Sequence, residues 1–160
     1  GVYNQEGIGS PNTISYSGSV TFNEVPCSVS PQSLTVTLGD FPVSDFTGTG
    51  TLTSPHTFDV NINCNDTVQP EAMITSANGY DTNFPGVINL TQETGVATGI
   101  GVQMLFDGEI PDFGTYRNTA GIAQANETLA IPFQVRYEQT AADVTPGSAN
   151  SIATITLGYK

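Results

Sequence analysis

The sequence predicts an all-β protein built as a sandwich of short strands. Apolar residues alternate with polar ones in one segment after another, and this spacing places every second side chain on the same face of a strand. The chain contains 17 Gly and 10 Pro, which interrupt it too often for long helices. At 160 residues it is long enough for one domain with a core of its own.

The strands follow from this alternation in chain order. The first contains Ile14, Tyr16, Gly18 and Val20 at alternate positions, whereas residues 1–11 show no usable alternation. Pro132 falls inside a strand pattern, which favours an edge position or a bulge there. The predicted strands are residues 12–22, 33–39, 57–64, 71–75, 86–90, 99–106, 129–138 and 150–159.

Charge and composition exclude several classes of function. The formal net charge is −12, with 15 Asp and Glu against 3 Lys and Arg. Nothing in such a chain would neutralise phosphates, so we expect no nucleic-acid partner, and anionic membrane surfaces are unfavourable for the same reason. Only 11% of the residues are charged, and Ser, Thr, Asn and Gly replace them on the surface. This composition favours an extracellular protein.

The two cysteines, Cys27 and Cys64, fit a single disulfide formed in an oxidising compartment. Two buried free thiols are the alternative. A bridge would stabilise the fold by about 3–4 kcal/mol through the loop that it closes.

No constellation of catalytic or metal-binding residues stands out. His56 is the only histidine, and Ser54 lies close to it in sequence, but adjacency along a chain does not make a catalytic triad. Asp107, Glu109 and Asp112 form an acidic segment rich in turn residues, best interpreted as a solvated loop. We therefore predict no enzymatic activity, no metal site and no cofactor.

Motifs at both ends of the chain carry a family resemblance. Near the front, "SGSVTFNEVPCSV" (17–29) places a Gly-x-Val-x-Phe strand before a cysteine. At the back, "VTPGSANSIATITLGY" (144–159) places a glycine fourteen residues from the end and a penultimate tyrosine. Between them follow "TVTLG" (35–39), "FDVNINC" (58–64), "TGIGVQML" (98–105) and "IPFQVRY" (131–137). This ordered set resembles a pilin of the chaperone–usher fimbriae of Gram-negative bacteria, of the type 1 or P-pilus kind.

The resemblance implies an incomplete immunoglobulin-like sandwich that lacks its last strand. A donor strand from a neighbouring subunit would complete it by β-strand addition. On this chain, residues 1–20 would form an N-terminal extension and residues 21–160 the pilin domain. The donor strand would be about residues 12–20, with the inward positions Asn12, Ile14, Tyr16, Gly18 and Val20. An ordinary first strand of a sandwich is the alternative.

The C-terminal strand would border the groove that receives the donor and would also bind the chaperone. The residues assigned to it by the resemblance are Gly147, Ala153, Ile155, Leu157 and Tyr159. A plain core strand is the alternative interpretation, and the two are compatible. The chain departs from the family pattern in the length of residues 1–11 and in its terminal Lys160.

The function implied is a structural subunit of an adhesive fimbria that polymerises head to tail by donor-strand exchange. Its partners would be identical or related pilins, with a periplasmic chaperone and an outer-membrane usher during assembly. The product would lie outside the cell, on its surface. The alternative is a tip adaptor or an adhesin-like module with a receptor site on its loops. A lysine-cross-linked pilin of Gram-positive type is disfavoured, because Lys160 is the only lysine.

Overall fold

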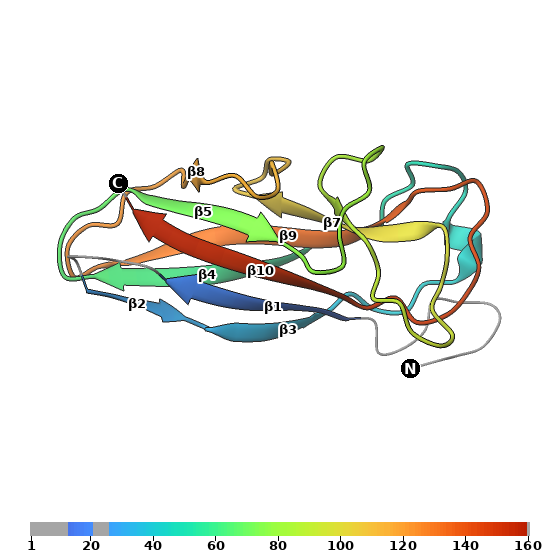
Figure 1. Cartoon of the computed structure of the whole chain (residues 1–160), viewed down its shortest axis with the longest axis horizontal. Coiled ribbons are helices and arrows are strands. Elements are labelled where there is room, and N and C mark those ends of the chain that lie inside the picture. The colour runs from blue at the N-terminus through green and yellow to red at the C-terminus, as the bar shows by residue number, and fades with distance from the viewer. Residues whose placement is uncertain (1–12, 21–25, 160) are drawn as a thin grey trace.

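Two five-stranded β-sheets pack face to face in the computed structural model (Figure 1). The structure describes residues 13–20 and 26–159, and for residues 13–20 it describes the backbone. The first sheet has the strand order β3-β1-β10-β5-β8. Its strands are β3 (Ser33–Thr37), β1 (Thr13–Val20), β10 (Ser151–Tyr159), β5 (Pro70–Thr75) and β8 (Arg117–Asn118).

The second sheet has the strand order β2-β4-β9-β7-β6. Its strands are β2 (Cys27–Ser30), β4 (His56–Cys64), β9 (Thr128–Gln139), β7 (Ile100–Phe106) and β6 (Val87–Ile88). A single turn of 3₁₀ helix, η1 (Val43–Asp45), is the only helical segment among the described residues. The consecutive strands β2 and β3 lie in different sheets, so the chain crosses the sandwich around Pro31.

The predicted β-sandwich is confirmed, and each predicted strand overlaps an observed one. Two observed strands, β2 and β8, were not predicted from the sequence. They have four and two residues respectively, which is too short for an alternating pattern to rise above chance. Their positions are instead fixed by pairing with β4 and β5.

The core lies between the two sheets and is filled by the alternating residues of their long strands. β4 and β9 each bury every second side chain over much of their length, as the period of two requires. Phe133 stacks on Phe58 and Phe106, with ring centroids 5.5 and 5.2 Å apart. The alternation that predicts the strands therefore also supplies the packing that holds the sheets together.

The expectation of an edge position or a bulge at Pro132 was wrong, because β9 is a central strand, paired with β4 and β7. Asp59 is the register partner of Pro132 on β4. On the other side, the carbonyl of Pro132 accepts a hydrogen bond from the amide of Asp107 at 3.0 Å, immediately after β7 ends at Phe106. The nitrogen of a strand residue faces the same way as its carbonyl. The missing N–H thus faces the point where the neighbouring strand has ended.

The predicted disulfide is present and joins Cys27 to Cys64. The two residues are direct register partners at one end of the β2–β4 pair. Cys64 is buried in the core, and its alternation with Ile62 and Val60 placed it on the inner face. The bridge anchors the start of β2 to the second sheet.

Candidate functional site

The C-terminal strand β10 lies in the interior of the first sheet, between β1 and β5 (Figure 1). Ala153, Ile155 and Leu157 on this strand are fully buried in the core between the sheets. Tyr159 is half-buried and packs against the core from its edge. Four of the five residues predicted to line a groove thus share one strand, and three of them belong to the core.

The strand beside β10 comes from the N-terminal segment of the same chain. β1 is inserted between β10 and β3, parallel to β10 and antiparallel to β3. Figure 1 shows the arrowheads of β1 and β10 pointing the same way. Every other strand pair in the described part of the chain is antiparallel. The N-terminal segment of the same chain therefore fills the position between β3 and β10.

The register places the predicted inward positions of the donor segment opposite the buried residues of β10. The register partners of Ile14, Tyr16, Gly18 and Val20 are Ser151, Ala153, Ile155 and Leu157. All four of these β10 residues are buried. Asn12, the remaining predicted donor residue, lies outside the described residues. The period of two in the donor segment is thus in phase with that of β10.

The predicted incomplete immunoglobulin-like sandwich is confirmed, and in the single chain its own N-terminal segment supplies the completing strand. The prediction that this segment enters a neighbour's groove, and that residues 1–20 are a separate extension, stays a prediction.

Gly147 lies apart from the other predicted groove residues, in the loop before β10. A Cβ atom at this position would lie 2.2 Å from the carbonyl oxygen of Gly95 and 2.6 Å from the amide nitrogen of Ala97. Its neighbour Ser148 forms an isolated parallel bridge with Val96. The glycine thus allows two backbone segments to touch in the loop ahead of β10.

Tyr137 contributes to the same region, although sequence analysis treated it only as a strand residue. Its side chain is fully buried, and its hydroxyl donates a hydrogen bond of 2.6 Å to the carbonyl of Ala149, just before β10. Burial raises the pKa of Tyr137 well above the ordinary value, and the charge of Asp40 adds to the shift. A strand pattern signals that such a side chain is buried, but not what its hydroxyl bonds to.

Three of the residues considered for catalysis contact other parts of the fold. The Nε2 atom of His56 lies 3.1 Å from the carbonyl oxygen of Leu38. Asp107 accepts a hydrogen bond from the amide of Ala120, and Glu109 forms an ion pair with Arg117. Among residues 13–20 and 26–159, no group of three or more His, Cys, Asp or Glu side chains is placed to hold a metal ion.

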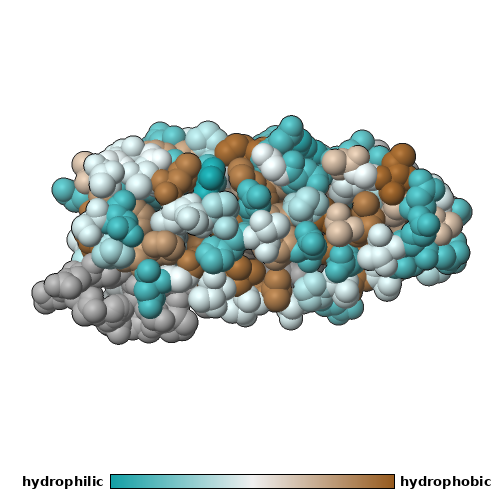
Figure 2. All heavy atoms as spheres, turned by 180° about the vertical axis from the view of Figure 1, so that it is seen from behind, coloured by the Kyte–Doolittle hydropathy of each residue, from teal (hydrophilic) through white to brown (hydrophobic). Residues whose placement is uncertain are grey.

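The surface is mixed in polarity. Figure 2 shows small groups of hydrophobic residues among polar ones on the face turned away from the view of Figure 1. Among the residues whose burial the structure describes, the exposed large hydrophobic ones are Leu52, Ile110, Tyr116, Ile122 and Ile152. In the described part of the chain, no helix is long and apolar enough to cross a membrane.

Comparison with known proteins assigns nearly the whole chain to one family. Residues 14–160 match the family described as fimbrial protein. The chain is 30% identical over 156 residues to the fimbrial subunit type 1 of Salmonella typhimurium, covering 92% of this chain and 82% of that protein. It is 32% identical over 160 residues to the type-1 fimbrial protein, A chain, of Salmonella typhi, covering 94% of this chain and 84% of that protein.

The fold is also that of a solved pilin. The crystal structure of the P pilus rod subunit PapA matches with a TM-score of 0.65 at 16% identity, over 84% of this chain and 99% of that one. The two-sheet β-sandwich of this chain is thus a fold that it shares with a pilus rod subunit. This chain belongs to the fimbrial protein family, and the resemblance to chaperone–usher pilins is confirmed.

Proposed function

We propose that this fimbrial subunit polymerises by donor-strand exchange, with residues 12–20 of one copy entering the slot between β3 and β10 of the next. The observation that carries the proposal is the occupancy of that slot by β1. The slot accepts an extended segment in register with buried residues of β10, and main-chain hydrogen bonds are available on both of its sides. A second copy of the same segment meets the same chemical requirements.

The direction of β1 in the single chain is imposed by its short connection to β2. Residues 21–26 join Val20 to Cys27, and an extended chain of this length spans at most about 25 Å. If β1 ran antiparallel to β10, it would run parallel to β3, and Val20 would lie near Thr37. That position is about 30 Å along the strands from Cys27, at ~3.3 Å per residue. The connection is too short for this, so β1 runs parallel to β10.

A donor strand from a neighbour is free of that constraint and can run antiparallel to β10. Such a strand would run parallel to β3, so the slot holds one parallel and one antiparallel pair in either direction, and the type of pairing alone favours neither. The closed monomer is the form from which exchange starts.

An empty slot would expose the edges of β3 and β10 together with the core residues behind them. Unpaired edges with apolar surface promote aggregation. A periplasmic chaperone that covers the slot, and an outer-membrane usher that receives the subunit, meet this requirement during assembly. The assembled fimbria would then lie on the cell surface, and the role is structural rather than enzymatic.

The test is to delete residues 1–20 and compare the truncated and full-length chains by size-exclusion chromatography and electron microscopy. We expect the full-length chain to form SDS-resistant polymers on prolonged incubation and the truncated chain to form none. A synthetic peptide of residues 12–22 should bind the truncated chain and raise its melting temperature. The matched control is the same peptide with its sequence scrambled.

If the truncated chain is a stable monomer that ignores the peptide, then residues 12–22 do not complete the fold and the proposal fails. It also fails if both chains form the same polymers, because the contacts would then lie elsewhere.

A further inference from the structure

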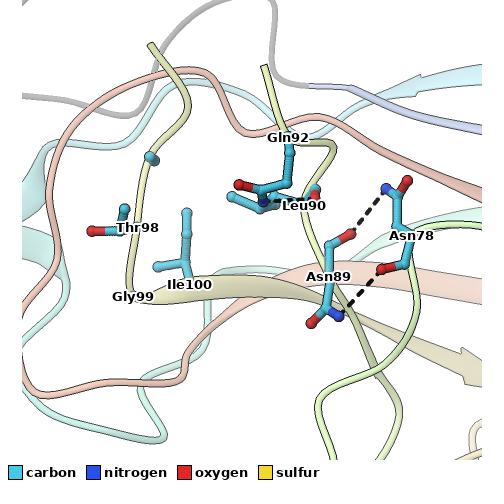
Figure 3. Close-up of a pocket in the computed structure, with 8 residues that line it drawn as sticks. Asn78, Asn89, Leu90, Gln92, Thr98, Gly99 and Ile100 are labelled. Atoms are coloured by element: carbon cyan, nitrogen blue, oxygen red, sulfur yellow. Dashed lines mark hydrogen bonds between the residues drawn. The ribbon is translucent and has the colours of Figure 1, made fainter. Parts of the chain in front are cut away.

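A polar pocket opens at the end of the molecule where β10 begins (Figure 3). Its volume is about 420 Å³, within the range of small-molecule sites. Figure 3 shows Asn78 and Asn89 on one side, Thr98 to Ile100 on the other, and Leu90 and Gln92 between them. The described residues that line it are Asn78, Asn89, Leu90, Gln92, Ala97, Thr98, Gly99 and Ile100.

Hydrogen bonds hold the wall formed by the two asparagines. Nδ2 of Asn78 donates hydrogen bonds to the carbonyl of Asn89 and to Oγ1 of Thr91, both at 3.0 Å, and to Oγ of Ser151 at 3.3 Å. Nδ2 of Asn89 returns a hydrogen bond of 3.3 Å to the carbonyl of Asn78. The pocket wall is thus joined to the first residue of β10.

The same network leaves hydrogen-bond acceptors on the pocket side. Because Nδ2 of Asn89 turns toward Asn78, its Oδ1 points away from that residue (Figure 3). Nε2 of Gln92 donates to the carbonyl of Leu90 at 3.1 Å, which leaves its Oε1 unused. Neither oxygen receives a hydrogen bond from the described residues. Oγ1 of Thr98 shares a hydrogen bond of 2.7 Å with Oγ1 of Thr145 and keeps further capacity, since a hydroxyl both donates and accepts.

The other described residues that line the pocket are mostly apolar, and none of them is a cation. Leu90, Ala97 and Ile100 are buried beneath the polar groups. Neither Arg117 nor Arg136, the two basic residues that the structure describes, lines the pocket. Glu93, which accepts a hydrogen bond from Asn150 at 3.2 Å, adds a negative charge near the pocket. An anionic ligand would therefore meet repulsion without a compensating partner.

We propose that this pocket binds a neutral sugar unit. Fixed amide oxygens accept hydrogen bonds from sugar hydroxyls, the threonine hydroxyl can act in either sense, and the apolar floor suits the C–H groups of a pyranose ring. No aromatic side chain among the described residues lines the pocket to stack on the ring, so we expect a single site to bind weakly. Repetition of a weak site along a polymer of subunits raises the avidity for a surface that carries many sugars. This gain in avidity is the only part of the inference that rests on the proposed function.

The experiment uses the full-length monomer and two-dimensional ¹H–¹⁵N NMR. The probes are the methyl glycosides of mannose, galactose, glucose and N-acetylglucosamine, with N-acetylneuraminic acid as the anionic comparison. Because a weak site has a Kd in the millimolar range, the titrations extend to about 50 mM. We expect at least one neutral glycoside to shift the backbone amides of Gln92, Thr98 and Gly99 saturably, and the anionic sugar to leave them unchanged.

Two variants locate the site. Gln92→Ala and Thr98→Ala remove pocket-facing groups without touching the Asn78 network, and each should raise the Kd about fivefold, as for one lost hydrogen bond. Gln124→Ala, at an exposed glutamine outside the pocket, is the matched control and should leave the Kd unchanged. The proposal is overturned if no neutral glycoside shifts these amides, if the anionic sugar binds more tightly, or if all three variants behave alike. None of these readouts needs polymerisation, so failure here leaves donor-strand exchange untouched.

Discussion

At the scale of single residues, Tyr137 fixes the loop that leads into β10. Its buried hydroxyl donates to the carbonyl of Ala149 at 2.6 Å. We predict that Tyr137→Phe lowers the free energy of unfolding by about 1–2 kcal/mol, because a buried carbonyl loses its donor. Urea unfolding measures this. Tyr116→Phe, at an exposed tyrosine, is the control, and an equal loss in both variants would contradict the role assigned to the hydroxyl.

The raised pKa of Tyr137 also predicts a dependence of stability on pH. In the unfolded chain this tyrosine ionises near its ordinary pKa of about 10, whereas in the folded chain burial keeps it protonated. Above that pH the unfolded state binds fewer protons, so stability falls as the pH rises. Between about pH 9 and pH 11, the free energy of unfolding of the native chain should fall by about 1 kcal/mol more than that of the Tyr137→Phe variant. Urea unfolding of both proteins at a series of pH values measures this difference. If the two profiles of stability against pH ran parallel, the tyrosine would titrate alike in the folded and unfolded states, and the prediction would be contradicted.

Gly147 offers a second test at this scale. A methyl group there would collide with the backbone of Gly95 and Ala97. We expect Gly147→Ala to destabilise the fold by about 2–3 kcal/mol, because rigid backbone must shift. Gly48→Ala is the matched control, since nothing lies within 4 Å of its added Cβ. Thermal unfolding compares the two, and a similar melting temperature for both would contradict the close contact.

At the scale of elements, the disulfide between β2 and β4 anchors the first strand after the donor segment. Cys27 and Cys64 are separated by 37 residues in sequence. Replacing both by Ala should lower the free energy of unfolding by about 4 kcal/mol, since the unfolded chain gains the entropy of an open loop. Urea unfolding of the double variant beside the oxidised native chain measures the loss. A change below about 1 kcal/mol would mean that the bridge adds little to the pairing of the strands.

Strand identity and strand partnership have different origins in this protein. β4 and β9 could be predicted because alternation is a property of a few neighbouring residues. β2 and β8 could not, because a strand of two to four residues is defined by its partner. Pro132 shows the same limit, since its place in a central strand depends on β7 ending at Phe106.

At the scale of the whole molecule, the net charge of −12 makes subunits repel one another. Raising the ionic strength from about 0.01 to 0.15 M shortens the screening length from ~30 to ~8 Å. We predict that polymerisation of the full-length chain becomes several times faster over this range, as followed by light scattering. The chain without residues 1–20 is the control for salt-induced aggregation. A rate that falls with salt would show that attraction between charges, rather than their repulsion, governs encounter.

The sequence by itself determined the class of fold, most strand positions, the disulfide and the family. These depend on local alternation, on there being only two cysteines, and on motifs at the two ends. It also placed Ala153, Ile155 and Leu157 on one face of the last strand.

The tertiary structure alone decided which strand lies beside β10 and in which direction it runs. It also decided that Gly147 packs on the backbone of a distant loop, and that Asn78, Asn89 and Thr98 meet around one pocket. The physical reason is that alternation among neighbouring residues determines which face of a strand is buried. The pairing of strands and the formation of pockets depend instead on contacts between residues that are far apart in the sequence. For β1, the decisive quantity is the reach of residues 21–26, a constraint that no pattern within the strand contains.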